Sequence, residues 1–336
     1  MSAVELASSA LVIGAARFGP GARLAQGAVV RGVSSDDVTI GAGSVVFENS
    51  VVLGGAGAPA VIGRRTVFGH RCLVVGATVG DLCEIGNASI IMTGAVLGDR
   101  VFLGEGTLVP AGATLPDESV AVGRPARIVR SASADDLARL VALRDGDLSL
   151  PAASSSTFST VHGIQEITTM GQLYEYRGIV PTVAPDAVLF PSAELTGDVV
   201  VGAGTIIGAG VKIIGDSHGP VRIGADVQIL ENTVLHLLPD NDLILDDGVI
   251  IGPGAMIHGC RIGAGSVVEP GAIVCDHSVL GAGSVVRAGA VVKQRSQFDA
   301  GSVVDGFPAV GVDRLSAPPA RPAWAFASLD ELPVRA

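Results

Sequence analysis

The chain has 336 residues, of which 46 are glycine, while aromatic residues make up only 4% and charged residues 16%. So few aromatics exclude a core built on Phe, Tyr and Trp, and the net charge of −11 excludes nucleic-acid binding, because phosphates require a basic surface. No apolar run approaches the ~20 residues of a membrane helix, and Met1–Ala16 lacks the basic region of a secretory signal. The four cysteines form no CxxC motif. We therefore expect a soluble, cytoplasmic protein with reduced thiols and no membrane partner.

Aliphatic residues recur every six positions in two stretches of the chain. A period of six suits neither a helix nor a long alternating strand, but it suits short strands separated by tight corners. A Val/Gly-rich β-sandwich is the alternative, and five consecutive steps of six, occurring twice, disfavour it. The two series are Val79, Ile85, Ile91, Leu97, Leu103, Val109 and Ile262, Val268, Val274, Leu280, Val286, Val292.

The two series are copies of each other at an offset of 183 residues. Glu48-Asn49 falls on Glu231-Asn232, and the offset holds without a gap over more than a hundred residues. The sequence thus predicts a tandem duplication. We expect the boundaries to be a first β-helix at 1–132, a helix and linker at 133–172, a second β-helix at 173–312 and a tail at 313–336.

The segment between the two copies has a different composition. Ala134–Leu143 has apolar residues spaced by three and four, with Ser133 as N-cap and acidic residues in the first turn, which predicts a short amphipathic helix. Asp145–Gly171 is typical of a flexible linker. The Pro- and Ala-rich tail after Asp313 is expected to dock loosely.

These repeats resemble those of the hexapeptide-repeat, left-handed β-helix proteins, in which three hexapeptides make one triangular coil. The resemblance covers most of the chain. It implies an all-β fold of two tandem left-handed parallel β-helices, joined by a short α-helix and a linker.

Several segments further resemble γ-class carbonic anhydrases, namely those at 174–178, 195–199, 227–236 and 257–260. In that family a metal lies between two neighbouring β-helices of a trimer, and the two sides contribute three histidines. Carried over to this chain, the first and third ligands are His236 and His258 in the second copy, where the second position is Pro253. The first copy has His70 at the second position, but Leu53 and Val75 at the other two. The resemblance therefore implies a zinc site, with cobalt or iron as alternatives, formed by His70, His236 and His258 between dissimilar copies.

An Arg–Asp pair that the family places across the same interface is divided in the same way. The first copy keeps Arg31 but has Val33 in place of the acid, and the second keeps Asp216 but has Ile214 in place of the arginine. The family's acidic position is matched in both copies, by Glu48 and Glu231, which could orient water or imidazole or could serve as corner residues. The family's catalytic glutamine is replaced in both copies by an apolar residue, Phe47 in the first and Leu230 in the second.

Three functions follow as hypotheses. The first is a zinc-dependent γ-carbonic-anhydrase-like enzyme that activates water or a carbonyl for a hydrolytic or acyl-transfer step on a small acyl or thioester compound, with CO2 hydration less favoured. The second is a metal-free hexapeptide-repeat acyltransferase that uses acyl-CoA and a histidine base. The third is a non-catalytic scaffold with a degenerate site. In each case we expect a homo-oligomer, with His162 and His277 as solvated residues and His218 as a solvated loop residue or proton shuttle.

Overall fold

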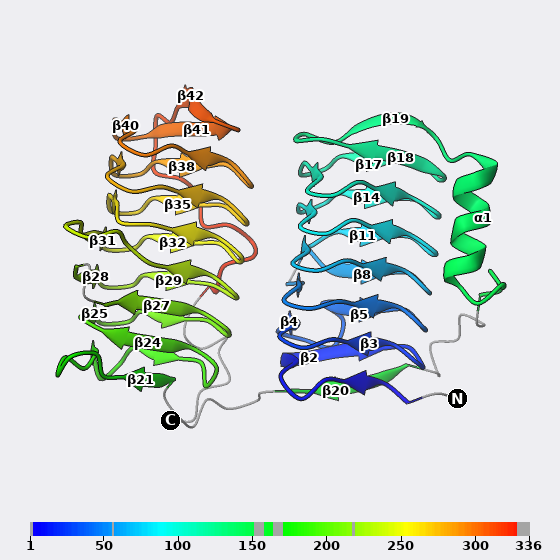
Figure 1. Ribbon diagram of the computed structural model, residues 1–336, viewed down its shortest axis with the longest axis horizontal. Helices are drawn as coiled ribbons and strands as arrows, with labels where there is room; N and C mark the ends of the chain where they lie inside the picture. The colour runs from blue at the N-terminus through cyan, green and yellow to red at the C-terminus, as the bar shows by residue number, and fades with distance from the viewer. Residues whose placement is uncertain (1–2, 56, 151–157, 164–170, 217–218, 328–336) are drawn as a thin grey trace. The chain divides into compact units, whose positions relative to one another are not determined.

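The computed structural model describes the chain except for residues 1–2, 56, 151–157, 164–170, 217–218 and 328–336. The chain divides into two compact units, Met1–Gln165 (unit 1) and Glu166–Ala336 (unit 2). Each unit is a left-handed parallel β-helix, and one α-helix follows the first (Figure 1). Among the described helices, none is long and apolar enough to span a membrane.

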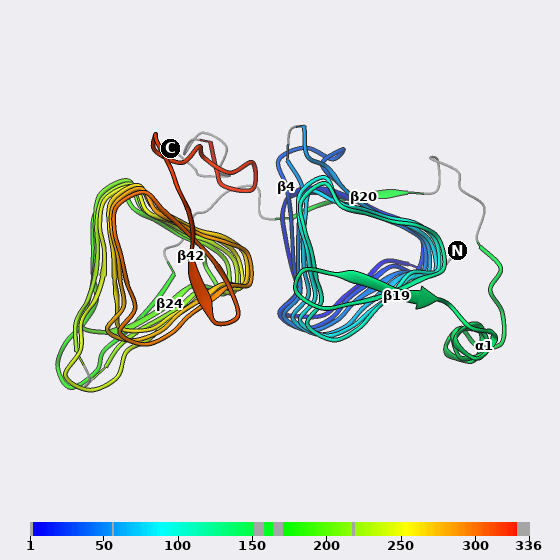
Figure 2. The same ribbon diagram turned by 90° about the horizontal axis from the view of Figure 1, so that it is seen from above.

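Each coil consists of three short strands, so each unit has the triangular outline seen in Figure 2. Successive coils pair in parallel, and the strands stack into three faces, which we name A, B and C in chain order and match between units by the 183-residue offset. The short strands follow from the sequence, because a corner residue interrupts each pair of aliphatic positions before the strand can lengthen.

In unit 1, face A contains β1 (Glu5–Leu6), β3 (Arg23–Leu24), β6 (Val45–Val46), β9 (Val67–Phe68), β12 (Glu84–Ile85), β15 (Phe102–Leu103), β18 (Ser119–Val122) and β19 (Arg127–Ser131). Face B contains the first part of β2 (Leu11–Phe18), then β4 (Val29–Gly32), β7 (Val51–Leu53), β10 (Leu73–Val75), β13 (Ile90–Ile91) and β16 (Leu108–Val109). Face C contains the second part of β2, then β5 (Val38–Ile40), β8 (Ala60–Ile62), β11 (Thr78–Val79), β14 (Val96–Leu97), β17 (Thr114–Leu115) and β20 (Ser159–His162).

In unit 2, face A contains β23 (Val188–Leu189), β26 (Ile206–Ile207), β29 (Gln228–Ile229), β32 (Ile250–Ile251), β35 (Val267–Val268), β38 (Val285–Val286), β41 (Ser302–Gly306) and β42 (Ala309–Arg314). Face B contains β21 (Gln172–Tyr174), β24 (Glu194–Gly197), β27 (Lys212–Gly215), β30 (Val234–Leu235), β33 (Met256–Ile257), β36 (Ile273–Val274) and β39 (Val291–Val292). Face C contains β22 (Thr182–Val183), β25 (Val199–Val201), β28 (Val221–Ile223), β31 (Leu243–Leu245), β34 (Arg261–Ile262), β37 (Val279–Leu280) and β40 (Gln297–Phe298).

Among the strands that the structure describes, three pairs depart from the parallel arrangement. β19 runs antiparallel to β18 at the end of the first β-helix, and β42 runs antiparallel to β41 at the end of the second. β20 runs antiparallel to β2 in the opening coil of unit 1.

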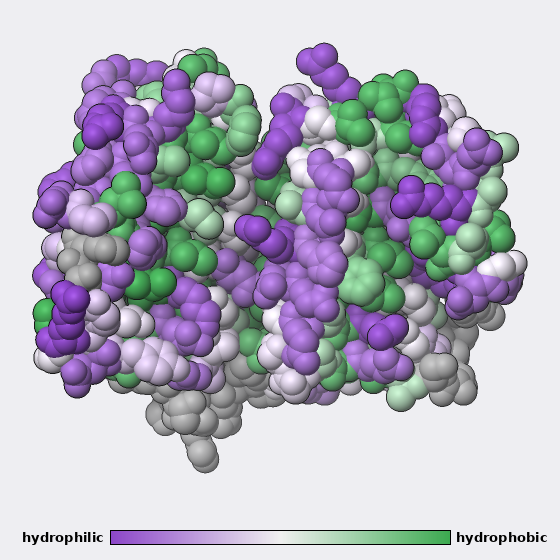
Figure 3. Space-filling model, viewed as in Figure 1, coloured by the Kyte–Doolittle hydropathy of each residue, from purple (hydrophilic) through white to green (hydrophobic). Residues whose placement is uncertain are grey.

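The repeated aliphatic residues point into the two cores, as the period of six predicts. All six residues of the first series are at most 4% exposed, and those of the second at most 1%. Each unit has its own buried cluster of these side chains. Some outward positions are apolar as well, and Figure 3 shows hydrophobic side chains between hydrophilic ones on the outer surface of both units. The cores therefore need few aromatics, because each coil buries its aliphatic residues against the coils above and below.

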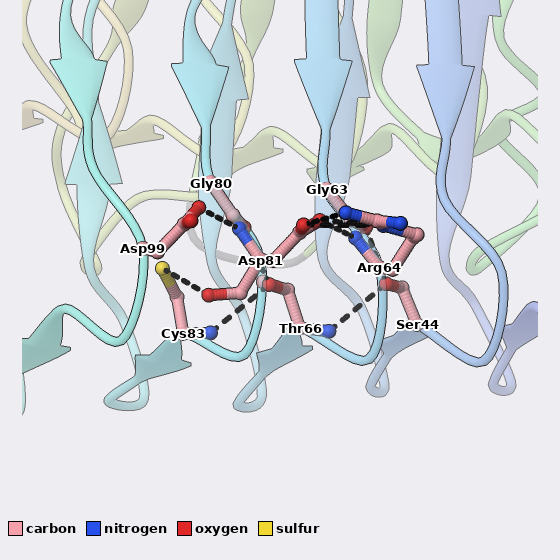
Figure 4. Close-up of polar contacts among 8 residues, drawn as sticks. All are labelled: Ser44, Gly63, Arg64, Thr66, Gly80, Asp81, Cys83 and Asp99. Atoms are coloured by element: carbon pink, nitrogen blue, oxygen red, sulfur yellow. Dashed lines mark hydrogen bonds and ion pairs between the residues drawn. The ribbon is translucent and has the colours of Figure 1, made fainter. Parts of the chain in front are cut away.

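Small polar residues at the corners join each coil to the next (Figure 4). The Thr66 amide donates to Ser44 Oγ at 2.9 Å, and the Thr66 hydroxyl donates to the Gly80 carbonyl at 2.7 Å. The Cys83 amide then donates to Thr66 Oγ1 at 3.0 Å. A buried backbone amide without a hydrogen-bond partner destabilises the fold. This ladder gives a partner to the corner amides that do not pair within the strands.

A second line of polar contacts runs along the same corner (Figure 4). The Asp81 carboxylate pairs with the Arg64 guanidinium, and the Asp81 amide donates to Asp99 Oδ1 at 2.8 Å. The charged residues at this corner thus contact the neighbouring coil through both side chain and backbone.

The duplication is visible in the backbone as well as in the sequence. Gly14 has φ +71°, and a Cβ there would lie 2.0 Å from the Gly32 carbonyl oxygen. Its counterpart Gly197 has φ +75°, and a Cβ there would lie 2.1 Å from the Gly215 oxygen. Both copies therefore need glycine at this corner for the same steric reason.

The predicted helix is confirmed as α1 (Ala134–Leu143). Ser133 is its N-cap and forms a capping box with Asp136, and Leu140 is fully buried. The Arg144 guanidinium after the helix contacts the Glu84 carboxylate of β12 at 2.5 Å, which ties the end of the helix to face A.

Two segments differ from what composition suggests. Much of the predicted linker lies outside the described residues, but its described part includes β20, which pairs with β2 in the register Ala15 to His162. The tail is mostly exposed over residues 314–323, as loose docking predicts, but residues 324–326 are buried, and Phe326 is only 1% exposed. Pairing with a distant strand and docking on a distant side chain both depend on tertiary contacts, which composition does not report.

Candidate functional site

The candidate residues lie at two different corners of the β-helix. Glu48 and His70 follow face A strands β6 and β9 in unit 1, whereas His236 and His258 follow face B strands β30 and β33 in unit 2. These corners are the two ends of face B. Five residues separate the equivalent corners in unit 2, from Glu231 to His236, which is about 16 Å for extended chain. A single β-helix therefore cannot bring both kinds of corner together.

The corner of unit 2 brings two imidazoles and two carboxylates together. Because Leu235 pairs with Ile257 in the ladder, His236 and His258 are neighbours, and their ring centroids lie 6.1 Å apart at an interplanar angle of 81°. The Asp216 carboxylate lies 3.8 Å from His236 Nε2. The structure thus brings together the predicted residues Asp216, His236 and His258.

Sequence reasoning missed the fourth member of this group, Asp276. Its side chain is 4% exposed, and its Oδ2 lies 3.7 Å from His258 Nδ1. Its Oδ1 accepts hydrogen bonds from the Leu238 amide and from Asn241 Nδ2, both at 3.2 Å. The available signal was the spacing, since Asp276 follows His258 by 18 residues, the length of one regular coil of three hexapeptides.

Asn241 joins this carboxylate to the backbone beside His258. Its Nδ2 also donates to the Gly259 carbonyl at 2.6 Å. The 183-residue offset places Ala58 at the position of Asn241, Val75 at that of His258 and Thr93 at that of Asp276. The whole arrangement is therefore specific to unit 2.

The corner of unit 1 holds a shorter imidazole–carboxylate contact. His70 Nδ1 lies 2.8 Å from Glu48 Oε2, and the His70 ring stacks on Phe47 with centroids 5.3 Å apart. The His70 and Glu48 side chains are 56% and 42% exposed. If Nδ1 carries the proton that Glu48 accepts, Nε2 has a free lone pair and can act as a base.

A pocket of about 420 Å³ lies beside His70 in unit 1. Outward residues of face A form one wall, including Phe102, and residues of α1, including Arg139 and Leu143, form another. The wall is mixed, because Glu105 and Asn87 line it together with apolar side chains. A small molecule with an apolar part and a polar end fits this lining.

The remaining predicted residues are buried elsewhere. Arg31 lies on β4 and is 5% exposed, Glu231 follows β29 and is fully buried, and Leu230 is fully buried beside it. The pairing of Arg31 with Asp216 involves both units and stays a prediction, as does the joining of His70 to His236 and His258.

The other candidate polar residues do not form a catalytic or metal-binding group in the described part of the chain. Burial raises the pKa of the Cys72 and Cys83 thiols to about 12, so both stay protonated at neutral pH and are poor nucleophiles. His277 follows β36 with φ +59°, and His218 lies outside the described residues. Within the part of the chain that the structure describes, no group of three or more His, Cys, Asp and Glu residues could hold a metal ion.

The repeats of this chain are similar to those of known proteins. The family model described as "Hexapeptide repeat of succinyl-transferase" matches residues 59–93 and 248–288, one stretch in each unit. The carnitine operon protein CaiE of Escherichia coli strain K12 is 37% identical over 107 residues, which are 32% of this chain and 54% of CaiE. CaiE of Proteus sp. strain LE138 is 35% identical over 108 residues, with the same two shares.

The chain thus spans about half the length of the curated relatives it matches. Among solved structures, a hexapeptide transferase family protein from Anaplasma phagocytophilum is 29% identical, with a TM-score of 0.42, over 43% of this chain and 85% of that one. The six-residue period, the triangular coils and the repeat match in both units agree. The chain therefore carries two left-handed β-helices in tandem, each with a stretch that matches the hexapeptide-repeat model.

Proposed function

We propose that this protein transfers an acyl group from an acyl-CoA thioester to a small-molecule acceptor, with His70 as the general base. The observation that carries the proposal is the 2.8 Å contact between His70 Nδ1 and Glu48 Oε2 beside the pocket of about 420 Å³. The repeat matched in both units, which is named for a succinyl-transferase, supports acyl transfer as the reaction class.

In this mechanism the Glu48 carboxylate accepts a hydrogen bond from His70 Nδ1–H. This contact holds the ring so that Nε2 faces the acceptor. Nε2 takes the proton of the acceptor hydroxyl or amine as that group attacks the thioester carbonyl. The C–S bond breaks when the tetrahedral intermediate collapses, and the imidazolium returns the proton to the leaving thiolate. The pocket offers an apolar wall beside polar groups such as Glu105 and Asn87, against which the acyl chain and the acceptor can be positioned.

Acceptor-dependent release of CoA from acetyl-CoA, followed by mass spectrometry with a panel of amines and alcohols, tests this proposal. His70→Asn should lower turnover by about 10²-fold or more, because general-base catalysis contributes about 10²–10⁴-fold. Glu48→Gln should give a smaller loss. His162→Asn, at an exposed histidine on β20, is the matched control and should leave turnover unchanged. Full turnover in His70→Asn would exclude His70 as the base.

A second candidate function is metal-dependent hydrolysis or transfer of an acyl group, with zinc, cobalt or iron held by His70, His236 and His258. It is favoured because each of these imidazoles has a carboxylate at one ring nitrogen, Glu48 at 2.8 Å, Asp216 at 3.8 Å and Asp276 at 3.7 Å. Metal-binding histidines commonly donate their second ring nitrogen to a carboxylate. The Glu48 distance matches such a hydrogen bond, whereas the distances to Asp216 and Asp276 are longer.

The donors fit a metal in part. Three imidazoles are a common donor set for catalytic zinc, and unit 2 places two of them side by side. The third would come from the face A corner of another β-helix, in the same chain or in a second copy, because face B separates the two corners within one unit. A metal there would supply Lewis acidity toward a carbonyl or water, with Arg31 and Glu231 as further polar groups.

Metal analysis separates the two candidates. Under the second, the purified protein holds stoichiometric metal, which His70→Ala, His236→Ala and His258→Ala each remove and His277→Ala does not. Removal of metal by EDTA then abolishes turnover, whereas under the first candidate turnover persists. Loss of metal in His258→Ala but not in His70→Ala would exclude the shared site. A metal-free protein without acyl-CoA turnover would instead be the scaffold considered from the sequence.

The oligomer and the compartment belong to the same proposal. We infer a cytoplasmic homo-oligomer, since a site made from two β-helices can recruit its second corner from another copy and since all four cysteines are free thiols. Light scattering on the full chain tests the oligomer, and a monomeric mass would contradict it.

A further inference from the structure

The chain after β42 descends along face A of unit 2. We call residues 315–327 the C-terminal strap. The Leu315 amide donates to the Gly301 carbonyl at 2.7 Å at the level of β41. Pro319 lies at the next level down, near Gly283, and Phe326 lies further down, at Gln228 of β29. The strap therefore crosses the stacked strands instead of pairing with one of them (Figure 1).

Gln228 holds the end of the strap through its backbone. Gln228 Nε2 donates to the Phe326 carbonyl at 2.9 Å, and the Phe326 amide donates to Gln228 Oε1 at 3.0 Å. The Phe326 ring stacks on Phe190, with centroids 6.3 Å apart. The Gln228 side-chain amide thus pairs with both backbone groups of Phe326, while Phe190 contacts its ring, so backbone and side chain of one strap residue are both held.

Gln228 stands out in its surroundings. On the outward side of face A its ladder neighbours are Ile206 and Ile250, and it is only 6% exposed itself. The 183-residue offset places Val45 at its position in unit 1. A buried amide among aliphatic residues is unfavourable without partners, so this glutamine is explained by the peptide backbone that it binds.

The duplication shows what the strap replaces. Residues 317–326 fall on α1 at the 183-residue offset, and Ser316 falls on the N-cap Ser133. Pro318, Pro319 and Pro322 then occupy positions that are helical in unit 1. Proline in a helix interior removes a backbone donor and clashes with the preceding turn, so this copy of the segment is not helical. It instead makes a turn, in which the Ala325 amide donates to the Pro322 carbonyl at 3.0 Å. After this turn the Phe326 amide and carbonyl are available to Gln228, and the Arg321 guanidinium of the strap also donates to the Phe326 carbonyl at 2.9 Å.

We propose that face A of unit 2 is a docking surface for a short aromatic peptide, and that its resident occupant is the strap of the same chain. The strap is a tethered ligand: a short connection to β42 keeps it at high effective concentration, so modest contacts suffice to hold it. It can leave as a unit without breaking the parallel ladder, and a second peptide of the same chemistry can take its place.

The only tryptophan of the chain, Trp324, lies in the strap and is 7% exposed, so its fluorescence reports docking directly. Gln228→Leu removes the amide but suits the neighbouring isoleucines, and Phe326→Ala leaves the β-helix untouched. Both variants of the full chain should shift the emission of Trp324 to the red and raise its acrylamide quenching about twofold or more, with unchanged circular dichroism. Gln297→Leu, at an exposed glutamine on β40, is the matched control and should change neither.

Competition tests whether the surface accepts a peptide in trans. A synthetic peptide of residues 319–327 carrying Trp324→Phe, at millimolar concentration, should raise the quenching of Trp324 in the wild-type chain. Unchanged emission and quenching in both Gln228→Leu and Phe326→Ala would overturn the proposal, as would failure of the peptide to displace the strap. Wild-type quenching that rises on dilution would show that the strap docks on a second copy, and so would exclude the same chain as its occupant.

Discussion

Asp276 lies one regular coil beyond His258, and its buried carboxylate faces the Nδ1 atom of that imidazole at 3.7 Å. A carboxylate at this position favours the tautomer with the proton on Nδ1 and leaves the Nε2 lone pair outward. Asn241 holds the carboxylate and the backbone after His258 at once, so the acid is placed relative to the backbone beside the ring. The acid therefore lies beside Nδ1 before any ligand arrives, at a distance slightly longer than a hydrogen bond.

We predict that Asp276→Asn weakens metal binding at the unit 2 corner about 10- to 100-fold, because loss of a carboxylate partner has that effect on histidine ligands. The asparagine Oδ1 can still accept the hydrogen bond of the Leu238 amide, so the fold should persist. Zinc affinity measured by chelator competition, alongside the thermal midpoint, checks this. Asp305→Asn, at an exposed aspartate, is the control. Unchanged zinc affinity in Asp276→Asn would contradict the role of Asp276.

At the residue scale, the sequence predicts the burial of the repeated aliphatic residues well. It predicts contacts between side chains on successive coils poorly where those coils differ in length. Each aliphatic residue of the two series is buried, because one period determines every inward position. His236 and His258 are 22 residues apart, because the loop between β30 and β31 lengthens that coil. A regular coil length of 18 residues therefore does not predict that they are neighbours. Their proximity follows from the resemblance and from the ladder, in which Leu235 pairs with Ile257.

Helix α1 covers part of face A in unit 1, and its start depends on local capping. The Ser133 hydroxyl accepts the Asp136 amide, while the Asp136 carboxylate accepts the Ser133 amide. We predict that Ser133→Ala lowers the free energy of unfolding of unit 1 by about 1 kcal/mol, the usual cost of losing an N-cap. Thermal unfolding checks this against Ser131→Ala, at an exposed serine on β19, which should have no effect. Equal stability of the two variants would mean that tertiary contacts alone hold the helix.

The elements show where sequence reasoning stops. Capping and apolar spacing predict α1 because both signals are local. The equivalent segment of unit 2 has prolines and no helix, and its docking depends on Gln228, 98 residues before Phe326. β20 likewise pairs with a strand from the start of the chain. Such contacts are long-range, so composition describes these segments as tail and linker only.

The molecule has two separate hydrophobic cores, one in each unit. We predict two calorimetric transitions and that Phe68→Ala, which empties a fully buried position in unit 1, moves only one of them. The cost should be about 3–5 kcal/mol, as for other buried phenylalanines. Val61→Ala, at an outward position on β8 that is 37% exposed, should cost far less. A single transition that Phe68→Ala shifts as a whole would show that the units unfold together.

The antiparallel strands β19 and β42 have a further consequence for the length of the protein. A parallel β-helix ends in an open ladder, whose free amides and carbonyls could accept another coil or another molecule and so build a fibre. A strand of reversed direction cannot template a further parallel strand, and here one such strand follows the last face A strand of each β-helix. A further coil at these ends would therefore find no parallel partner on face A, which disfavours growth by single coils. The 183-residue duplication instead repeats a β-helix together with its terminating strand.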